Sequence, residues 1–200
     1  IQAYAACATF ADAQVGRLLD ALDRSPHAGN TIIVLWSDHG FHLGEKQHWE
    51  KFALWEKTTR VPLLVVAPGV VKKGGRCEEP VSLLDLYPTL VDLCRMKPRR
   101  ELEGFNLAPF LRGEKFRRER PVLTTWGRGN HAVRSSRWRY ISYGDGTGEL
   151  YDHSVDPSEW HNLAAAPGAE HERVMRDLRK WIPTREAPQV ADMVSDRKQE

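Results

Sequence analysis

The chain has 200 residues, of which 41% are hydrophobic and 28% are charged, a composition that is typical of globular proteins. Its formal net charge of +2, from 29 basic and 27 acidic residues, gives no general reason to expect binding to nucleic acid or to an anionic membrane. The longest apolar run, residues 63–71, contains a Pro-Gly pair and is too short to cross a bilayer.

The first third of the chain predicts a helix followed by two buried strands. Small and apolar residues recur every three or four positions over 4–22, which predicts an amphipathic helix that ends before Pro26. The runs 31–36 and 61–67 are almost continuously apolar and rich in β-branched residues. Such runs are typical of parallel strands that are covered by helices on both faces.

A second helix and a connector follow. Ser82 and Asp85 form a capping-box pattern at the start of a helical stretch that runs to Cys94. Pro88 lies inside this stretch, so we expect a kink or a restart there. Residues 95–120 are rich in Arg, Lys, Glu, Pro and Gly, which favours a connector.

After the connector the pattern changes to short strands separated by Gly-rich turns, with a strong hairpin signal at Asp145-Gly146. These strands predict a small antiparallel sheet, and a final amphipathic helix follows it, with Val174, Leu178 and Trp181 on one face. The predicted strands and helix are residues 122–125, 132–134, 138–143, 149–151 and 168–181.

The three cysteines, Cys7, Cys77 and Cys94, are too few and too scattered for a disulfide framework, and none has metal-site spacing. A Cys77–Cys94 bridge stays open, but buried free thiols are the favoured interpretation.

The segment after the first predicted strand carries the residues best suited to chemistry. Asp38 and His39 come at the carboxyl end of that strand, the edge where open parallel sheets bind ligands. An ionised Asp there is costly unless a cation satisfies it, and Gly40 permits a sharp turn of the backbone. By the dipeptide alone, the favoured alternative is a turn Asp that caps the backbone beside a hydrogen-bonded His.

The same loop adds three more cationic or imidazole side chains before Lys51, namely His42, Lys46 and His48. Together they would form a cationic mouth suited to an oxyanion. For His42 and His48 simple exposure is the favoured interpretation, Lys46 is expected to be solvated, and Trp49 is expected to pack.

An ordered set of motifs changes the balance for Asp38, His39 and Lys51. The motifs are Ser37-Asp38-His39-Gly40, Leu43-Gly44-Glu45, Trp49-x-Lys51, Thr59-Arg60-Val61-Pro62-Leu63 and Ala67-Pro68-Gly69. This set resembles the second half of the sulfatase family, and the flanking segments 12–19, 85–90, 133–140 and 149–163 also resemble that family, in order along nearly the whole chain. The pairing of Asp-His with a Trp-x-Lys spacing is most similar to iduronate-2-sulfatase-like members.

This resemblance implies an α/β fold of the alkaline-phosphatase superfamily: part of an alkaline-phosphatase-like sheet covered by helices, then a small antiparallel sheet with a C-terminal helix. Residues 1–115 would be the C-terminal part of the catalytic domain, and residues 116–200 an antiparallel β subdomain with its terminal helix. The chain begins with Ile1 and shows no signal peptide. We therefore expect it to be the C-terminal half of a longer enzyme.

The resemblance also implies roles for three residues. Asp38 would be a carboxylate ligand of a divalent cation, most often Ca²⁺, which as a hard ion favours carboxylate oxygen. His39 would be a metal ligand or a catalytic residue that hydrogen-bonds the nucleophile or a sulfate oxygen. Lys51 would be catalytic and would bind the substrate, because its ammonium would contact the sulfate as charge gathers on the sulfate oxygens.

The implied activity is hydrolysis of a sulfuric ester on a sulfated small molecule or glycan, with neither nucleic acid nor membrane as partner, in a periplasmic or secreted protein. The family's formylglycine arises from a Cys/Ser-x-Pro-x-Arg motif, which this chain lacks, since Cys7 precedes Ala8-Thr9-Phe10-Ala11. We therefore expect the formylglycine in a missing N-terminal half, without which the chain would be inactive. Arg128, His131 and Arg134 are candidates for touching an acidic sugar, although ordinary exposed surface is the favoured interpretation for them.

Two alternatives remain. The first is a phosphate or phosphonate ester hydrolase of the same superfamily, which would share the Asp-His-Gly strand end; the spacing from Trp49 to Lys51 and the C-terminal signature favour a sulfatase. The second is a non-catalytic fragment. A sheet divided through its middle would expose apolar strand faces and an edge, so we expect the chain alone to aggregate or to fold only in part.

Overall fold

The computed structural model describes residues 1–71, 74–115 and 117–188. The chain divides into two compact units: the first comprises Ile1–Lys51 and Arg60–Arg117, and the second comprises Phe52–Thr59 and Arg118–Glu200. A short segment from the first half of the sequence therefore belongs with the C-terminal sheet. The assignment of 1–115 and 116–200 to a catalytic domain and a subdomain stays a prediction, and residues 116 and 189–200 lie outside the described part.

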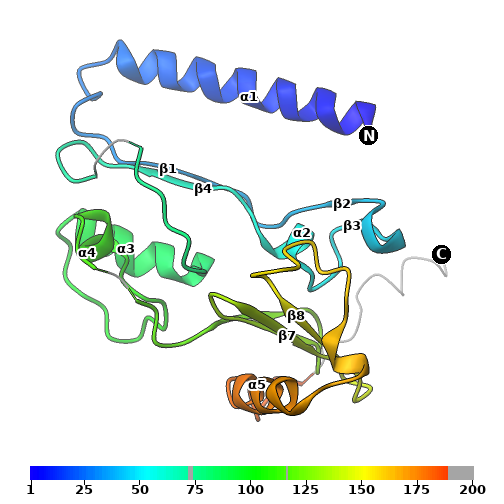
Figure 1. Cartoon of the computed structure of the whole chain (residues 1–200). Helices are drawn as coiled ribbons and strands as arrows, with labels where there is room; N and C mark the ends of the chain where they lie inside the picture. The colour runs from blue at the N-terminus through cyan, green and yellow to red at the C-terminus, as the bar shows by residue number, and fades with distance from the viewer. Residues whose placement is uncertain (72–73, 116, 189–200) are drawn as a thin grey trace, which may run out of the picture. The chain divides into compact units, whose positions relative to one another are not determined.

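The first unit holds helices and four short strands (Figure 1). The helices are α1 (Gln2–Asp23), α3 (Leu86–Leu93) and α4 (Ala108–Leu111), and the strands are β1 (Ile33–Trp36), β2 (His42–Leu43), β3 (Trp49–Glu50) and β4 (Leu63–Val66). The strands form two separate two-stranded sheets, β1 with β4 and β2 with β3.

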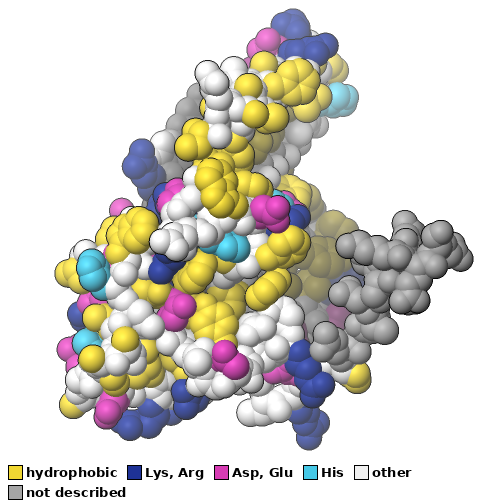
Figure 2. Space-filling view, turned by 90° about the vertical axis from the view of Figure 1, so that its right-hand side faces the viewer, with side chains coloured by type: hydrophobic (Ala, Val, Ile, Leu, Met, Phe, Trp, Pro, Cys, Tyr) yellow, Lys and Arg dark blue, Asp and Glu magenta, His cyan; other side chains and the backbone are white. Residues whose placement is uncertain are grey.

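The two apolar runs form strands as expected, but the expected parallel pairing is wrong. Strand β1 pairs with β4 in antiparallel register, from Ile33 opposite Val66 to Trp36 opposite Leu63. The expected burial on both faces is also not seen, because Trp36, Leu64 and Val66 are each about half exposed and α1 buries no residue. A continuous apolar run marks a strand that needs cover, but it carries no information about strand direction. Figure 2 shows one face of the molecule, on which hydrophobic side chains lie at the surface among charged ones.

The capping box at Ser82 is present. The Ser82 hydroxyl accepts from the backbone N–H of Leu84 at 3.3 Å, and the Asp85 carboxylate accepts from the N–H of Ser82 at 2.8 Å. A 3-10 turn covers Leu83–Asp85, and α3 begins at Leu86. The restart thus precedes Pro88, which falls in the first turn of α3, where a missing N–H breaks no helical hydrogen bond.

The second unit is a four-stranded antiparallel sheet with helices, as the sequence predicts. Its strands pair in the order β5-β6-β7-β8, and a glycine with φ of +88°, Gly146, turns the chain between the last two. Its elements are α2 (Glu56–Thr59), β5 (Val122–Thr125), β6 (His131–Arg134), β7 (Trp138–Ser142), β8 (Gly148–Asp152) and α5 (Ala169–Arg179).

Alternation along the strands gives this sheet two apolar faces. Tyr140 packs with Leu178 of α5 on one face, whereas Ile141 packs with Leu54 on the other. The packing of α5 against the sheet can be followed in Figure 1. Trp181, expected on the packed face of the helix, is instead 43% exposed, because α5 ends at Arg179.

The expectation of buried thiols is wrong, because Cys7, Cys77 and Cys94 are all free and exposed. Within the described residues, no helix combines the length and the apolar character that crossing a membrane requires.

Candidate functional site

The loop after β1 presents Asp38 and His39. The Ser37 hydroxyl donates to the backbone carbonyl of His39 at 2.8 Å, which holds the loop in place. The His39 Nδ1 atom lies 2.9 Å from the carbonyl oxygen of Gly40. A carbonyl can only accept, so Nδ1 carries a proton, and Nε2 is the ring nitrogen that faces the rest of the site.

A tight hairpin then returns the chain to His39. Gly44, with φ of +113°, opens a 3-10 turn between β2 and β3, and His42 stands opposite Glu50 in the register of the two strands. An L side chain is strained at such a φ, which explains the glycine. Because the strands run antiparallel, the residue that follows β3 comes back beside the loop that precedes β2, and that residue is Lys51.

The structure brings the three predicted site residues together. The Lys51 Nζ atom lies 3.1 Å from His39 Nε2, although twelve positions separate them in the sequence. The same Nε2 lies 3.8 Å from a carboxylate oxygen of Asp38. The Asp38 side chain is 81% exposed and that of His39 34%. A carboxylate open to a cation thus stands beside an ammonium that can meet an anion, with an imidazole between them.

The expectation of exposure is wrong for His42. Its side chain is fully buried, and its ring meets that of His48 edge-on, with 5.0 Å between centroids. Residue type alone favoured exposure for both rings, but the hairpin folds them together. His42 therefore cannot contribute to a cationic mouth that is open to solvent.

Two of the three sugar-binding candidates are committed to internal contacts, so exposed surface is also wrong for them. His131 is 2% exposed and contacts the Thr125 hydroxyl through Nδ1 at 2.9 Å and Glu186 through Nε2 at 3.2 Å. Arg134 is half-buried and donates to His153 Nδ1 at 3.0 Å. Only Arg128 is exposed.

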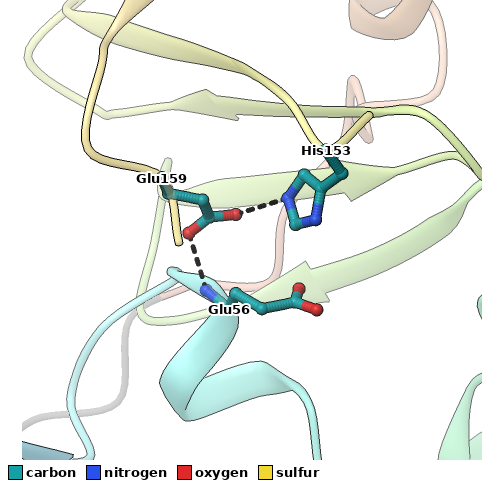
Figure 3. A group of neighbouring side chains, drawn as sticks. All are labelled: Glu56, His153 and Glu159. Carbon is teal, nitrogen blue, oxygen red and sulfur yellow. Dashed lines mark hydrogen bonds and ion pairs between the residues drawn. The ribbon is translucent and has the colours of Figure 1, made fainter. Parts of the chain in front are cut away.

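The second unit holds a buried charged cluster that the sequence did not reveal. Ligand atoms of Glu56, His153 and Glu159 lie within 4.8 Å of one another, a spacing that could hold a metal ion. In Figure 3 the Glu159 carboxylate reaches His153 Nε2 at 2.8 Å on one side and the backbone N–H of Glu56 at 2.7 Å on the other.

Arginines already neutralise this cluster. Arg139 is 2% exposed and donates through Nε to Glu159 at 2.5 Å and through Nη2 to Glu56. Burial raises the pKa of Glu159, but the hydrogen bonds from His153 and the Glu56 backbone, together with the charge of Arg139, lower that pKa overall. A metal ion would have to displace a guanidinium, so the cluster acts as an ion-pair network.

Comparisons with known proteins agree with this fold. The sulfatase family profile matches residues 1–96. Over 164 residues the chain is 46% identical to a sulfatase of Formosa agariphila. The aligned region covers 82% of this chain and 32% of that protein. The chain therefore spans about a third of the length of that curated relative.

Two solved structures are similar to this chain, and each alignment covers 84% of this chain and 38% of the other chain. One is a 2-O GAG sulfatase, with a TM-score of 0.74 and 31% identity. The other is the phosphonate monoester hydrolase of Silicibacter pomeroyi, with a TM-score of 0.73 and 26% identity. The mixed α/β fold, the profile match and the close relative together show that this chain belongs to the sulfatase family of the alkaline-phosphatase superfamily.

Proposed function

We propose that this chain supplies part of the metal and sulfate site of a sulfuric ester hydrolase. One observation carries the proposal, namely the 3.1 Å contact between Lys51 Nζ and His39 Nε2, next to Asp38 at the end of β1. A carboxylate for a cation and an ammonium for an anion are the two charges that the hydrolysis of a sulfate ester needs close together.

Asp38 and His39 fit a divalent cation as part of a larger ligand set. The Asp38 carboxylate is exposed, and its oxygens suit a hard ion such as Ca²⁺, which takes six to eight oxygen ligands. His39 offers only Nε2, which Lys51 already approaches. We therefore assign the stronger metal contact to Asp38 and give His39 the task of orienting the Lys51 ammonium or hydrogen-bonding a sulfate oxygen. When bound, the cation would polarise the sulfate ester.

Lys51 would stabilise the reaction by holding charge. As the ester bond breaks, negative charge grows on the sulfate oxygens, and a compact ammonium fixed beside them stabilises that charge. Because His39 Nδ1 donates to the Gly40 carbonyl, Nε2 can accept a hydrogen bond from the Lys51 ammonium.

The nucleophile would come from outside these 200 residues. The chain has no Cys/Ser-x-Pro-x-Arg motif and spans about a third of its relative, so we propose that an N-terminal half supplies formylglycine. A sulfated glycan is the proposed substrate class, because one similar structure is described as a 2-O GAG sulfatase. A periplasmic or secreted location is part of the same proposal.

Hydrolysis of 4-nitrocatechol sulfate tests this function. We expect no cleavage by the chain alone and cleavage once the N-terminal half is supplied. In that enzyme Lys51→Ala should lower kcat/KM by about 100-fold or more, as for loss of one group that stabilises transition-state charge. Lys57→Ala removes an exposed lysine of the neighbouring segment and should leave kcat/KM unchanged. Equal activity of the Lys51 and Lys57 variants would contradict the proposal.

Phosphonate ester hydrolysis is the second candidate, because the phosphonate monoester hydrolase matches the fold as well as the GAG sulfatase does. The same Lys51 contact would serve a phosphonate oxygen. Assaying 4-nitrophenyl phenylphosphonate beside 4-nitrocatechol sulfate separates the two, and a higher kcat/KM for the phosphonate would favour the hydrolase of that class.

A further inference from the structure

Glu159 combines two costly features. Its side chain is fully buried, and its backbone has a φ of +60°, in the left-handed region that glutamate rarely adopts. Strain of this kind persists only where the surroundings hold it in place, and it is concentrated at functional positions. The contacts of its carboxylate define the surroundings that hold it in place.

The charged side chains around Glu159 close into a ring within the second unit. Arg139 contacts both Glu56 and Glu159. Arg134 Nε lies 3.7 Å from Glu56, and its Nη2 lies 3.0 Å from His153 Nδ1. His153 Nε2 closes the ring onto Glu159.

The ring also binds backbone of the segment 52–59. Arg139 Nη1 donates to the carbonyl oxygen of Leu54 at 3.1 Å, and Glu159 accepts from the N–H of Glu56 at 2.7 Å. The Trp55 indole in the same segment donates to Glu149 at 2.6 Å. Side chains from β7, from β8 and from the region after β8 thus fix three consecutive residues that lie 83 to 103 positions away in the sequence.

These fixed residues begin three positions after Lys51. Three residues span at most about 11 Å of extended chain, so the anchor restricts where the backbone of Lys51 can lie. On its other side Lys51 follows directly on β3, which is paired with β2. The ammonium is therefore carried by a short stretch of chain that is held at both ends.

We propose that Arg139 is a positioning residue for Lys51: by binding the Leu54 carbonyl together with the Glu56 and Glu159 carboxylates, it fixes the segment that carries the sulfate-binding ammonium. This inference rests on the proposed function for the role of Lys51. It gives the C-terminal sheet a part in the reaction without any contact of Arg139 with the substrate.

Two variants of the intact enzyme containing this chain test the proposal. Arg139→Met removes the anchor. Arg137→Met is the matched control, because Arg137 lies two positions earlier and pairs with Asp152, away from the segment 52–59. Should Arg139→Met fail to fold, Arg139→Lys keeps the charge but cannot reach three partners at once.

The first measurement is hydrogen exchange of the backbone amides in peptides covering residues 49–56. We expect exchange to be about tenfold faster or more in Arg139→Met, the effect of about 1.4 kcal/mol of lost local stability, and unchanged in the Arg137 control. Exchange that is unchanged in both variants, or raised equally in both, would overturn the proposal.

The second measurement is a double-mutant cycle on kcat/KM with Lys51→Ala. A small misplacement of a catalytic group costs about 100-fold, so Arg139→Met alone should lower kcat/KM by that order. Added to Lys51→Ala it should cost almost nothing further, because the group that it positions is gone. If the losses in kcat/KM of the two single variants multiply in the double variant, Arg139 has only a structural role and the proposal is wrong. If no form of the enzyme cleaves sulfate esters, the proposed function fails, and the exchange data still decide whether Arg139 anchors the segment.

Discussion

Replacing Glu159 with glutamine should destabilise the second unit strongly at neutral pH. In the native protein both carboxylate oxygens of Glu159 accept hydrogen bonds. Oε1 accepts from Arg139 and His153, and Oε2 accepts from the backbone N–H of Glu56. Glutamine keeps the shape, but its amide group turns a donor toward one of these donors. Since removal of one partner of a buried ion pair costs about 3–5 kcal/mol, we expect a loss in that range.

The pH dependence gives this prediction its sharpest test. Burial alone would raise the pKa of Glu159, but the hydrogen bonds from His153 and the Glu56 backbone, together with the charge of Arg139, lower it in the folded protein. Its carboxylate therefore stabilises the fold above the ordinary glutamate pKa, and this contribution is lost as the pH falls through the lowered value. The difference in unfolding free energy between wild type and Glu159→Gln should have its full size at pH 7 and should decrease in acid.

Urea-dependent hydrogen exchange of peptides from β7 and β8, in the intact protein, measures the stability of the second unit separately. A difference in unfolding free energy of less than about 1 kcal/mol at neutral pH would mean that the Glu159 charge is not needed for stability. A gap that stays constant down to pH 3 would refute the assignment of the lost stability to the ionised carboxylate.

Three further predictions follow from other contacts. Hydrogen bonds from Arg137 lower the pKa of Asp152 to about 2, so acid should weaken the second unit between about pH 4 and pH 2, and Asp152→Asn should remove that step from the same urea series. Gly104→Ala would place a Cβ 2.0 Å from the Leu84 carbonyl oxygen and should cost about 1–3 kcal/mol by overpacking, seen as a lower Tm, whereas Gly29→Ala, with open space around it, should not. The chain alone should elute as aggregates and melt without a sharp transition; a monodisperse monomer with a cooperative melt would contradict that.

Local patterns predicted most elements of the second unit. The runs that became β7 and β8 flank the Asp145-Gly146 hairpin signal, and such a signal depends only on neighbouring residues. The apolar runs of β1 and β4 also predicted strands. Their direction depends on which strand pairs with which, and no local period encodes that choice. Strands β2 and β3 have two residues each, too short for any period to register.

The site residues were also predictable only where they lie close together in the sequence. Asp38, His39 and Lys51 form part of a recognisable motif at one strand end, and a hairpin needs only twelve residues to bring them together. The contacts of Arg139 with Glu56 and Glu159 join residues up to 83 positions apart. Charged residues are normally expected in solvent, so nothing in their local sequence marked them as buried.

Burial is distributed unevenly between the units, and this bears on how the site works. The largest fully buried apolar side chains, among them Tyr140, Ile141 and Leu150, belong to the second unit, whereas Trp36 and Leu64 in the strands beside the Asp38 loop are about half exposed. Apolar strand faces gain stability only when something covers them, at about 25 cal/mol for each Å² removed from water. The second unit can therefore serve as the rigid anchor for the segment after Lys51. We propose that the N-terminal half, which would also bring the nucleophile, covers the exposed strands beside the loop that presents Asp38 and His39.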